Sequence, residues 1–242
     1  MENTFVARPA GGRVVTIGRQ VGLADVRPDA TVRLDAIARF LQDVADHDAA
    51  TADLDGGLWV LRRLALRVDR TPRFRAELTC STWCSGVGAR WAERRTDLVF
   101  GELPCVQAAG VWVHVDRQTG APRPLPPGFD DLWGVSADGR RVRANLRHPP
   151  PPAGVDASAW PLRATDFDVV DHVNNAAYWA PVEDELARRG GPRVTAAEIE
   201  FRDGVYRDDP VEIVTDDRPD GFATWWCVRG DVRASALVAC AS

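Results

Sequence analysis

The sequence predicts an α+β fold of two tandem units, in each of which an antiparallel sheet wraps around one long helix. Apolar residues recur at helical spacing over two long segments, 31–51 and 172–190. Each of these segments is followed by four strand-like runs, which Gly, Pro and Asp separate as in antiparallel hairpins. The segments 66–80 and 199–214 also resemble each other, and a repeat over such a long period indicates a duplicated domain.

The first unit spans residues 1–116. Apolar and polar residues alternate over 13–27, which predicts a strand that leads into the first helix. That helix places Leu34, Ile37 and Leu41 on one face, which we expect to be buried. Further strands are expected at 57–69, 75–86, 89–100 and 104–116.

Residues 117–159 form a connection rich in Pro and Gly, and we expect it to cross the surface without packing. Four consecutive prolines at 149–152 predict a stiff extended segment within it. The second unit, 160–242, repeats the order of the first. Its elements are expected at 160–168 (strand), 172–190 (helix), and 193–205, 210–217, 221–231 and 233–242 (strands).

One long helix followed by four or five antiparallel strands is the order of elements in a hotdog unit, whose sheet wraps a largely buried helix. Two such units side by side can merge their sheets into one. The connection of 117–159 is long enough to carry the chain from one unit to the other. The predicted fold is therefore a double hotdog, with two tandem hotdog units.

The composition excludes several classes of protein. A chain of 242 residues with 45% hydrophobic and 27% charged residues is typical of a globular protein. No apolar run reaches the roughly 18 residues of a membrane span, and 1–12 lacks an apolar signal core, so we expect a cytoplasmic protein. The net charge of −5 disfavours nucleic-acid binding. The five cysteines lack metal-ligand spacing, and we expect neither a metal nor another cofactor.

The densest polar chemistry lies in residues 166–178, "DFDVVDHVNNAAY", directly before the second predicted helix. The wider stretch "TDFDVVDHVNNAAYWAPVEDEL" (165–186) resembles the signature of the acyl-ACP thioesterases of plants and bacteria. In that family an Asp-rich strand end runs into His-Val-Asn-Asn and then a Tyr-bearing helix. Further blocks resemble the family in the same order: "LQDVADHDAA" (41–50), "RLALRVDRTPRFRAELTCSTW" (63–83) and "AGVWVHVDRQTGAPRPLPPGF" (109–129).

The resemblance implies a double hotdog that hydrolyses an acyl thioester on acyl carrier protein and releases a free fatty acid. It also implies that the first half binds the acyl chain, where Trp59, Trp83 and Trp91 are candidates to shape the slot. Arginines at 62–63, 94–95 and 139–143 are candidates for a basic patch that attracts the acidic carrier protein. The resemblance leaves open the acyl chain length, coenzyme A as the carrier, and whether the protein is a monomer or a homodimer.

The residues of the motif suit the hydrolysis of a thioester. The first backbone N–H groups of a helix have no internal partner and carry partial positive charge, so they can stabilise an oxyanion. Asp168 lies four residues before His172, and the two can flank one water. Asp168 would be the general base, and His172 would orient the water or protonate the leaving thiolate. Asn174 can cap the helix or donate a hydrogen bond to the thioester.

Two positions depart from the family pattern. The family has Asp-x-Asn-x-His, and Val170 stands here at the position of the amide. The family also carries a carboxylate in the strand after the helix, where this chain has Gly204. The neighbouring Asp203 is the nearby substitute, and strand alternation points it to the opposite face unless Gly204 marks a bulge. These departures keep a second hypothesis open, a double hotdog that binds acyl thioesters without cleaving them. A hotdog dehydratase ranks last, because the first half shows no matching His and acid motif.

Overall fold

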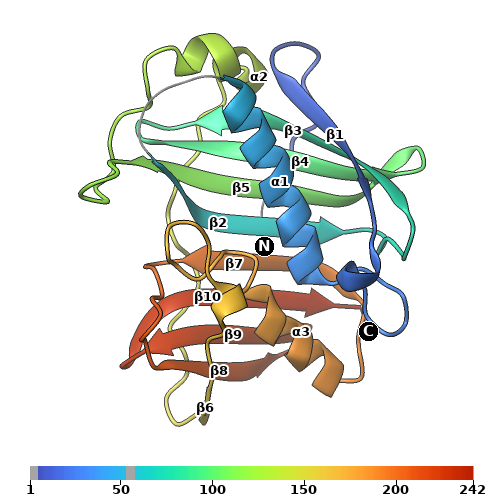
Figure 1. Ribbon diagram of the computed structural model, residues 1–242, viewed down its shortest axis with the longest axis vertical. Helices are drawn as coiled ribbons and strands as arrows, with labels where there is room; N and C mark the ends of the chain where they lie inside the picture. The colour runs from blue at the N-terminus through green and yellow to red at the C-terminus, as the bar shows by residue number, and fades with distance from the viewer. Residues whose placement is uncertain (1–4, 53–57, 242) are drawn as a thin grey trace.

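The computed structural model describes residues 5–52 and 58–241, and its strands form one antiparallel sheet of ten (Figure 1). The strand order is β1-β3-β4-β5-β2-β7-β10-β9-β8-β6. The two long helices, α1 and α3, lie on the same face of this sheet, one over each half (Figure 1). This arrangement confirms the predicted double hotdog.

The first half contains the helix and strands that the sequence predicts. The strand expected at 13–27 ends at Gln20, however, and a 3-10 helix, η1 (Leu23–Asp25), follows it. Residue 57, the expected start of the second strand, lies outside the described residues. The helix buries Leu34, Ile37 and Leu41, as its spacing predicts. The elements are β1 (Val14–Gln20), α1 (Leu34–Ala52), β2 (Leu58–Val68), β3 (Glu77–Val87), β4 (Trp91–Phe100) and β5 (Leu103–Val115).

The two half-sheets join where β2 pairs with β7, the strand of the second half that lies next to the first half. The register places Leu64 opposite Ile199, and both side chains are buried in a core that spans the two halves. The α3 residues Trp179, Val182 and Leu186 belong to the same core. The remaining elements are α3 (Trp179–Arg188), β7 (Val194–Phe201), β8 (Val211–Arg218), β9 (Gly221–Val228) and β10 (Asp231–Cys240), and residue 242 of the last expected strand is not among the described residues.

Two expectations for the start of the second half were wrong. The strand expected at 160–168 is replaced by β6 (Ala157–Ala159) and a short 3-10 turn, η3 (Ala164–Asp166), because Asp166 accepts the backbone N–H of Arg163 and turns the chain. The helix expected from residue 172 begins at Trp179. Pro181 explains this start, since proline fits a helix only in its first turn.

The connection between the halves packs more closely than the sequence predicts. Two short helices, η2 (Asp130–Gly134) and α2 (Val135–Ala137), follow the proline-rich stretch. Phe129 and Trp133 are buried there against Cys84 and Ala92 of the first half. The expectation of an unpacked connection was therefore wrong for this segment, because two aromatic side chains among the prolines find an apolar surface.

Candidate active site

A cavity of about 450 Å³ lies where the two halves meet. The second half contributes Asp168, Asn174 and Asn175 from the segment that precedes α3. The first half contributes residues of α1 and its sheet, and aromatic residues of the connection close one side. The principal lining residues of these parts are Gln42, Ala45, Trp59, Cys84, Arg94, Trp112, Phe129 and Trp133.

A tight loop places Asp168 in the wall of this cavity. The backbone N–H of Asp168 donates to the carbonyl of His172 at 3.0 Å, and Asp171 donates back to the carbonyl of Asp168 at 3.0 Å. Asp171 adopts a left-handed conformation with φ of 58°, which closes the turn. The Asp168 carboxylate accepts the backbone N–H of Val170 through Oδ1 at 3.0 Å. Its Oδ2 has no hydrogen bond to another described residue, so it is available to a water.

Asn174 caps the turns that lead into α3. Its Oδ1 accepts the backbone N–H of Ala176 at 2.8 Å, which leaves its Nδ2 as a donor. The backbone N–H of Asn175 has no hydrogen bond within the described part of the chain. Both asparagines line the cavity with Asp168. A carboxylate and two asparagines with unused donor groups therefore line the same cavity.

His172 is placed differently from Asp168 and Asn174. Its ring lies edge-on against Tyr206, with 4.8 Å between the ring centroids, and it is not among the residues that line the cavity. A Cβ at Gly204 would lie 3.5 Å from His172 Nδ1, so the position at which the family has a carboxylate does adjoin this histidine. Asp203 does not fill that role, because it accepts the N–H of Gly204 and pairs with Arg233.

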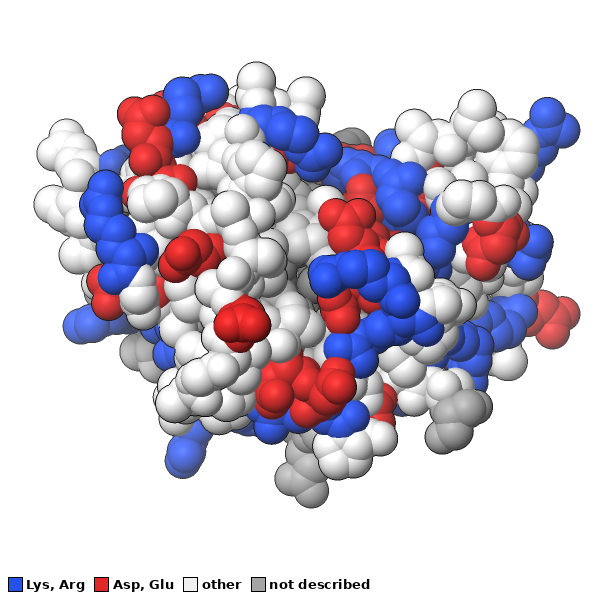
Figure 2. Space-filling model, turned by 90° about the horizontal axis from the view of Figure 1, so that it is seen from below, with Lys and Arg blue, Asp and Glu red and all other residues white. Residues whose placement is uncertain are grey.

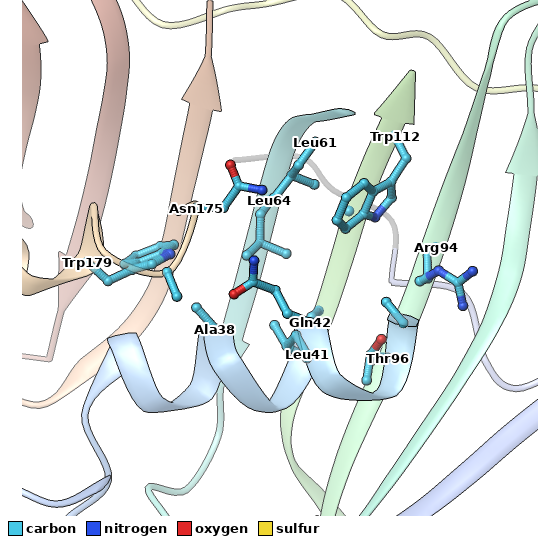
Figure 3. Close-up of a pocket in the computed structure, with 14 residues that line it drawn as sticks. Ala38, Leu41, Gln42, Leu61, Leu64, Arg94, Thr96, Trp112, Asn175 and Trp179 are labelled. Atoms are coloured by element: carbon cyan, nitrogen blue, oxygen red, sulfur yellow. The ribbon is translucent and has the colours of Figure 1, made fainter. Parts of the chain in front are cut away.

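A second, smaller cavity of about 20 Å³ continues beneath α1. It shares Gln42, Arg94, Trp112 and Asn175 with the larger cavity, and the two are together called the slot. Most of its remaining wall is apolar and comes from α1, β2, β5 and the start of α3 with the turn before it (Figure 3): Ala38, Leu41, Leu61, Leu64, Ala108, Ala176 and Trp179. The slot leads from Asp168 into the space between α1 and the first half-sheet.

The sequence located the polar end of the slot better than its walls. Among Trp59, Trp83 and Trp91, only Trp59 lines the slot. Trp83 is buried in the sheet, and Trp91 donates to the carbonyl of Val142. The sequence analysis did not identify Gln42, and the one signal that could have found it is its polar side chain beside Leu41 of the buried helix face.

One buried carboxylate connects three segments around the slot through hydrogen bonds. Asp48 of α1 is 1% exposed and accepts Arg94 NH1 at 2.5 Å, Arg13 Nε at 2.6 Å and Trp133 Nε1 at 3.0 Å. These partners come from β4, from the segment before β1 and from η2. Asp48 also neutralises the charge of Arg94 within the slot.

Cys84 is the cysteine in the slot wall, and it is poorly suited to act as a nucleophile. Burial raises the pKa of the Cys84 thiol to about 11, and the thiol donates to the carbonyl of Gly86. A thiol with this pKa stays protonated near neutral pH, whereas nucleophilic attack needs the thiolate. Cys84 is therefore not expected to act as a nucleophile in this cavity.

Four of the arginines expected in a basic patch are buried or paired with a carboxylate, and for the others the patch stays a prediction. Arg63 and Arg95 are buried, and Arg94 and Arg140 pair with Asp48 and Glu93. On the face shown in Figure 2, basic and acidic side chains are interspersed, and neither sign forms a continuous area.

A second polar cluster anchors the end of the connection to the sheet. The ligand-type atoms of His148, Glu198 and Glu200 lie within 4.8 Å of one another. Glu200 already accepts the backbone N–H groups of Arg147 and His148, and Arg63 lies 3.9 Å from Glu198. These partners compensate the buried charges, so the cluster is explained as an anchor without a metal.

Among the described residues, none of the helices has the length and apolar character of a membrane span.

Comparisons with known families match both halves of the chain. The model described as "Acyl-ACP thioesterase N-terminal domain" matches residues 19–131, and "Acyl-ACP thioesterase C-terminal domain" matches residues 153–232. An uncharacterized protein of Mycobacterium tuberculosis is 29% identical over 240 residues, which cover 97% of this chain and 95% of that protein. A chloroplastic acyl-[acyl-carrier-protein] hydrolase of Cuphea viscosissima is 24% identical over 225 residues, which cover 81% of this chain and 53% of the hydrolase.

Solved structures show the same fold. An acyl-ACP thioesterase from Bacteroides thetaiotaomicron superposes with a TM-score of 0.80 at 18% identity, covering 93% of this chain and 97% of that one. A 12:0-ACP thioesterase from Umbellularia californica also gives 0.80 at 18% identity, covering 96% of this chain and 98% of that one. Because these identities are low, the likeness shows the fold alone.

Proposed function

Since the chain belongs to the acyl-ACP thioesterase family, we propose that it hydrolyses fatty acyl thioesters on acyl carrier protein and releases free fatty acids. One observation carries the proposal. Asp168, Asn174 and Asn175 together line one end of a slot that continues between apolar side chains of α1, β2 and β5. An acyl chain in the slot would bring its thioester to these groups.

The proposed mechanism uses water as the nucleophile. Asp168 Oδ2 takes a proton from a water as the water oxygen attacks the thioester carbon. Asn174 Nδ2 and the N–H of Asn175 donate to the carbonyl oxygen as it becomes an oxyanion. The C–S bond then breaks, and the thiol leaves with a proton. That proton is the one that Asp168 took from the water, so its transfer to the sulfur restores the carboxylate. His172, whose ring lies outside the cavity, is not needed for the attack step.

The test is free-thiol release from acyl carrier protein and coenzyme A thioesters of short, medium and long chains. The proposal expects turnover with a chain-length optimum and a preference for the carrier protein. Its failure would be the absence of release from every thioester.

A non-catalytic acyl-binding protein is the second candidate. Two observations favour it: Val170 stands in place of the family's amide, and the His172 ring lies off the cavity. Saturable binding of an acyl thioester without thiol release would support this candidate.

Restoring the amide at position 170 should increase the rate. Val170 lines the cavity beside Asp168 and is 44% exposed, so an Asn side chain fits there without disturbing the core. An amide that orients the attacking water is expected to raise kcat about tenfold, which corresponds to one hydrogen bond of ordinary strength. The measurement is steady-state kcat of Val170→Asn against wild type. Val135→Asn makes the same change at an exposed valine of α2 and controls for general effects, and an equal response of both variants would contradict the prediction.

A further inference from the structure

The slot contains hydrogen-bond donors that a plain alkyl chain cannot use. The side chains of Gln42, from α1, and Asn175 line the smaller cavity together with the Trp179 indole (Figure 3). Neither side-chain amide makes a hydrogen bond to another described residue. A plain hydrocarbon chain in the slot would cover both amides without pairing them, and burying an unpaired polar group is unfavourable.

Trp179 provides an independent observation. It is completely buried, and its Nε1 has no acceptor among the described residues. Most buried polar groups in proteins are paired, so an unpaired N–H in a cavity wall calls for an acceptor that enters the cavity. Trp179 also lines the smaller cavity, whose volume of about 20 Å³ is enough for one water-sized group.

From this arrangement we propose that the slot selects acyl thioesters whose chain carries an oxygen close to the thioester, as in 3-hydroxyacyl or 3-oxoacyl groups. The amides of Gln42 and Asn175 and the Nε1–H of Trp179 donate to that oxygen. The inference rests on the proposed function, because it takes the thioester carbonyl to lie at Asn174 and Asp168. Asn175 directly follows Asn174, so a chain oxygen that accepts a hydrogen bond from the Asn175 amide lies within a few bonds of the thioester carbonyl.

The charges in the slot favour a neutral oxygen over a carboxylate. Arg94 is the cation that lines both cavities, and Asp48 already pairs with it at 2.5 Å. No other Lys or Arg among the described residues lines the smaller cavity, where the uncharged amides and the Trp179 indole are available as donors. A hydroxyl or keto oxygen matches them, and the alkyl remainder of the chain matches Leu41, Leu61 and Leu64.

The experiment compares three carrier-protein thioesters of one chain length: unsubstituted, 3-hydroxy and 3-oxo. For wild type, kcat/KM for at least one oxygenated thioester is expected to exceed that of the unsubstituted one by about tenfold, the contribution of one average hydrogen bond. Gln42→Leu removes the amide at similar volume and should reduce this ratio about tenfold. Gln20→Leu, the same change on the exposed edge strand β1, controls for the substitution itself. Equal rates for the three thioesters in wild type, or a Gln42→Leu ratio that matches wild type, would overturn the inference.

Two additions keep the test decisive. Trp179→Phe removes the Nε1–H and retains a large ring. If Gln42→Leu does not fold, the same ratio of kcat/KM values is measured with Trp179→Phe, and the same decrease is expected. Dissociation constants of the same thioesters for wild type separate the inference from the proposed function. If no thioester is hydrolysed, the proposed function fails, and the binding preference alone decides the inference: tighter binding of an oxygenated chain supports it, and equal or weaker binding refutes it.

Discussion

Replacing Asp168 with Asn is expected to lower kcat for thioester hydrolysis by roughly 10²–10⁴, the contribution of general acid–base catalysis. Asn is nearly the same size as Asp, and its Oδ1 can still accept the N–H of Val170. The loop should therefore keep its shape and lose only the base. The measurement is kcat with a saturating acyl thioester, with circular dichroism to verify the fold.

Asp171→Asn is the matched control for this prediction. Asp171 lies on the same loop, its side chain is 70% exposed, and it pairs with Arg207 at the surface. Its substitution should change kcat by less than about twofold, because surface ion pairs contribute little. Equal rates for wild type and Asp168→Asn would exclude Asp168 as the base.

Asp48→Asn is expected to reduce the free energy of unfolding by about 3–5 kcal/mol, the usual loss when one partner of a buried ion pair is removed. Asp48 is 1% exposed and accepts hydrogen bonds from Arg13, Arg94 and Trp133. Without its charge, the two guanidinium groups face each other without a counterion at the end of α1. Urea unfolding followed by tryptophan fluorescence measures the change.

Asp43→Asn is the control on the same helix. The Asp43 side chain is 48% exposed and pairs only with Arg19 among the described residues. Removing this surface pair should cost less than about 1 kcal/mol. A loss at position 48 as small as that at position 43 would show that Asp48 does not hold the walls of the slot together.

The regular elements of the sheet and α1 could be predicted because their patterns are local. Alternation of apolar and polar residues marks most strands, and Leu34, Ile37 and Leu41 mark the buried face of α1. The start of α3 was missed because the polar motif resembles a capped helix, whereas Pro181 limits the helix to residues from Trp179 onward. Phe129 and Trp133 were missed because the surrounding prolines dominate the pattern of the connection.

The candidate site also contains residues that the sequence could reveal and residues that it could not. Asp168 and Asn174 could be found because they stand in one short motif, and the structure places both at one cavity. Gln42 and Trp112 are far from that motif in the chain, and only the tertiary fold brings them to one cavity with Asn175. The orientation of the His172 ring also depends on a tertiary contact, with Tyr206, that no local pattern reveals.

The most direct test is a crystal structure of the Asp168→Asn variant with a bound acyl-pantetheine thioester. We expect the thioester carbonyl within hydrogen-bond distance of Asn174 Nδ2 and the Asn175 N–H, and the acyl chain between α1 and the strands β2, β4 and β5. An acyl chain bound elsewhere, or a thioester remote from position 168, would contradict the proposed site.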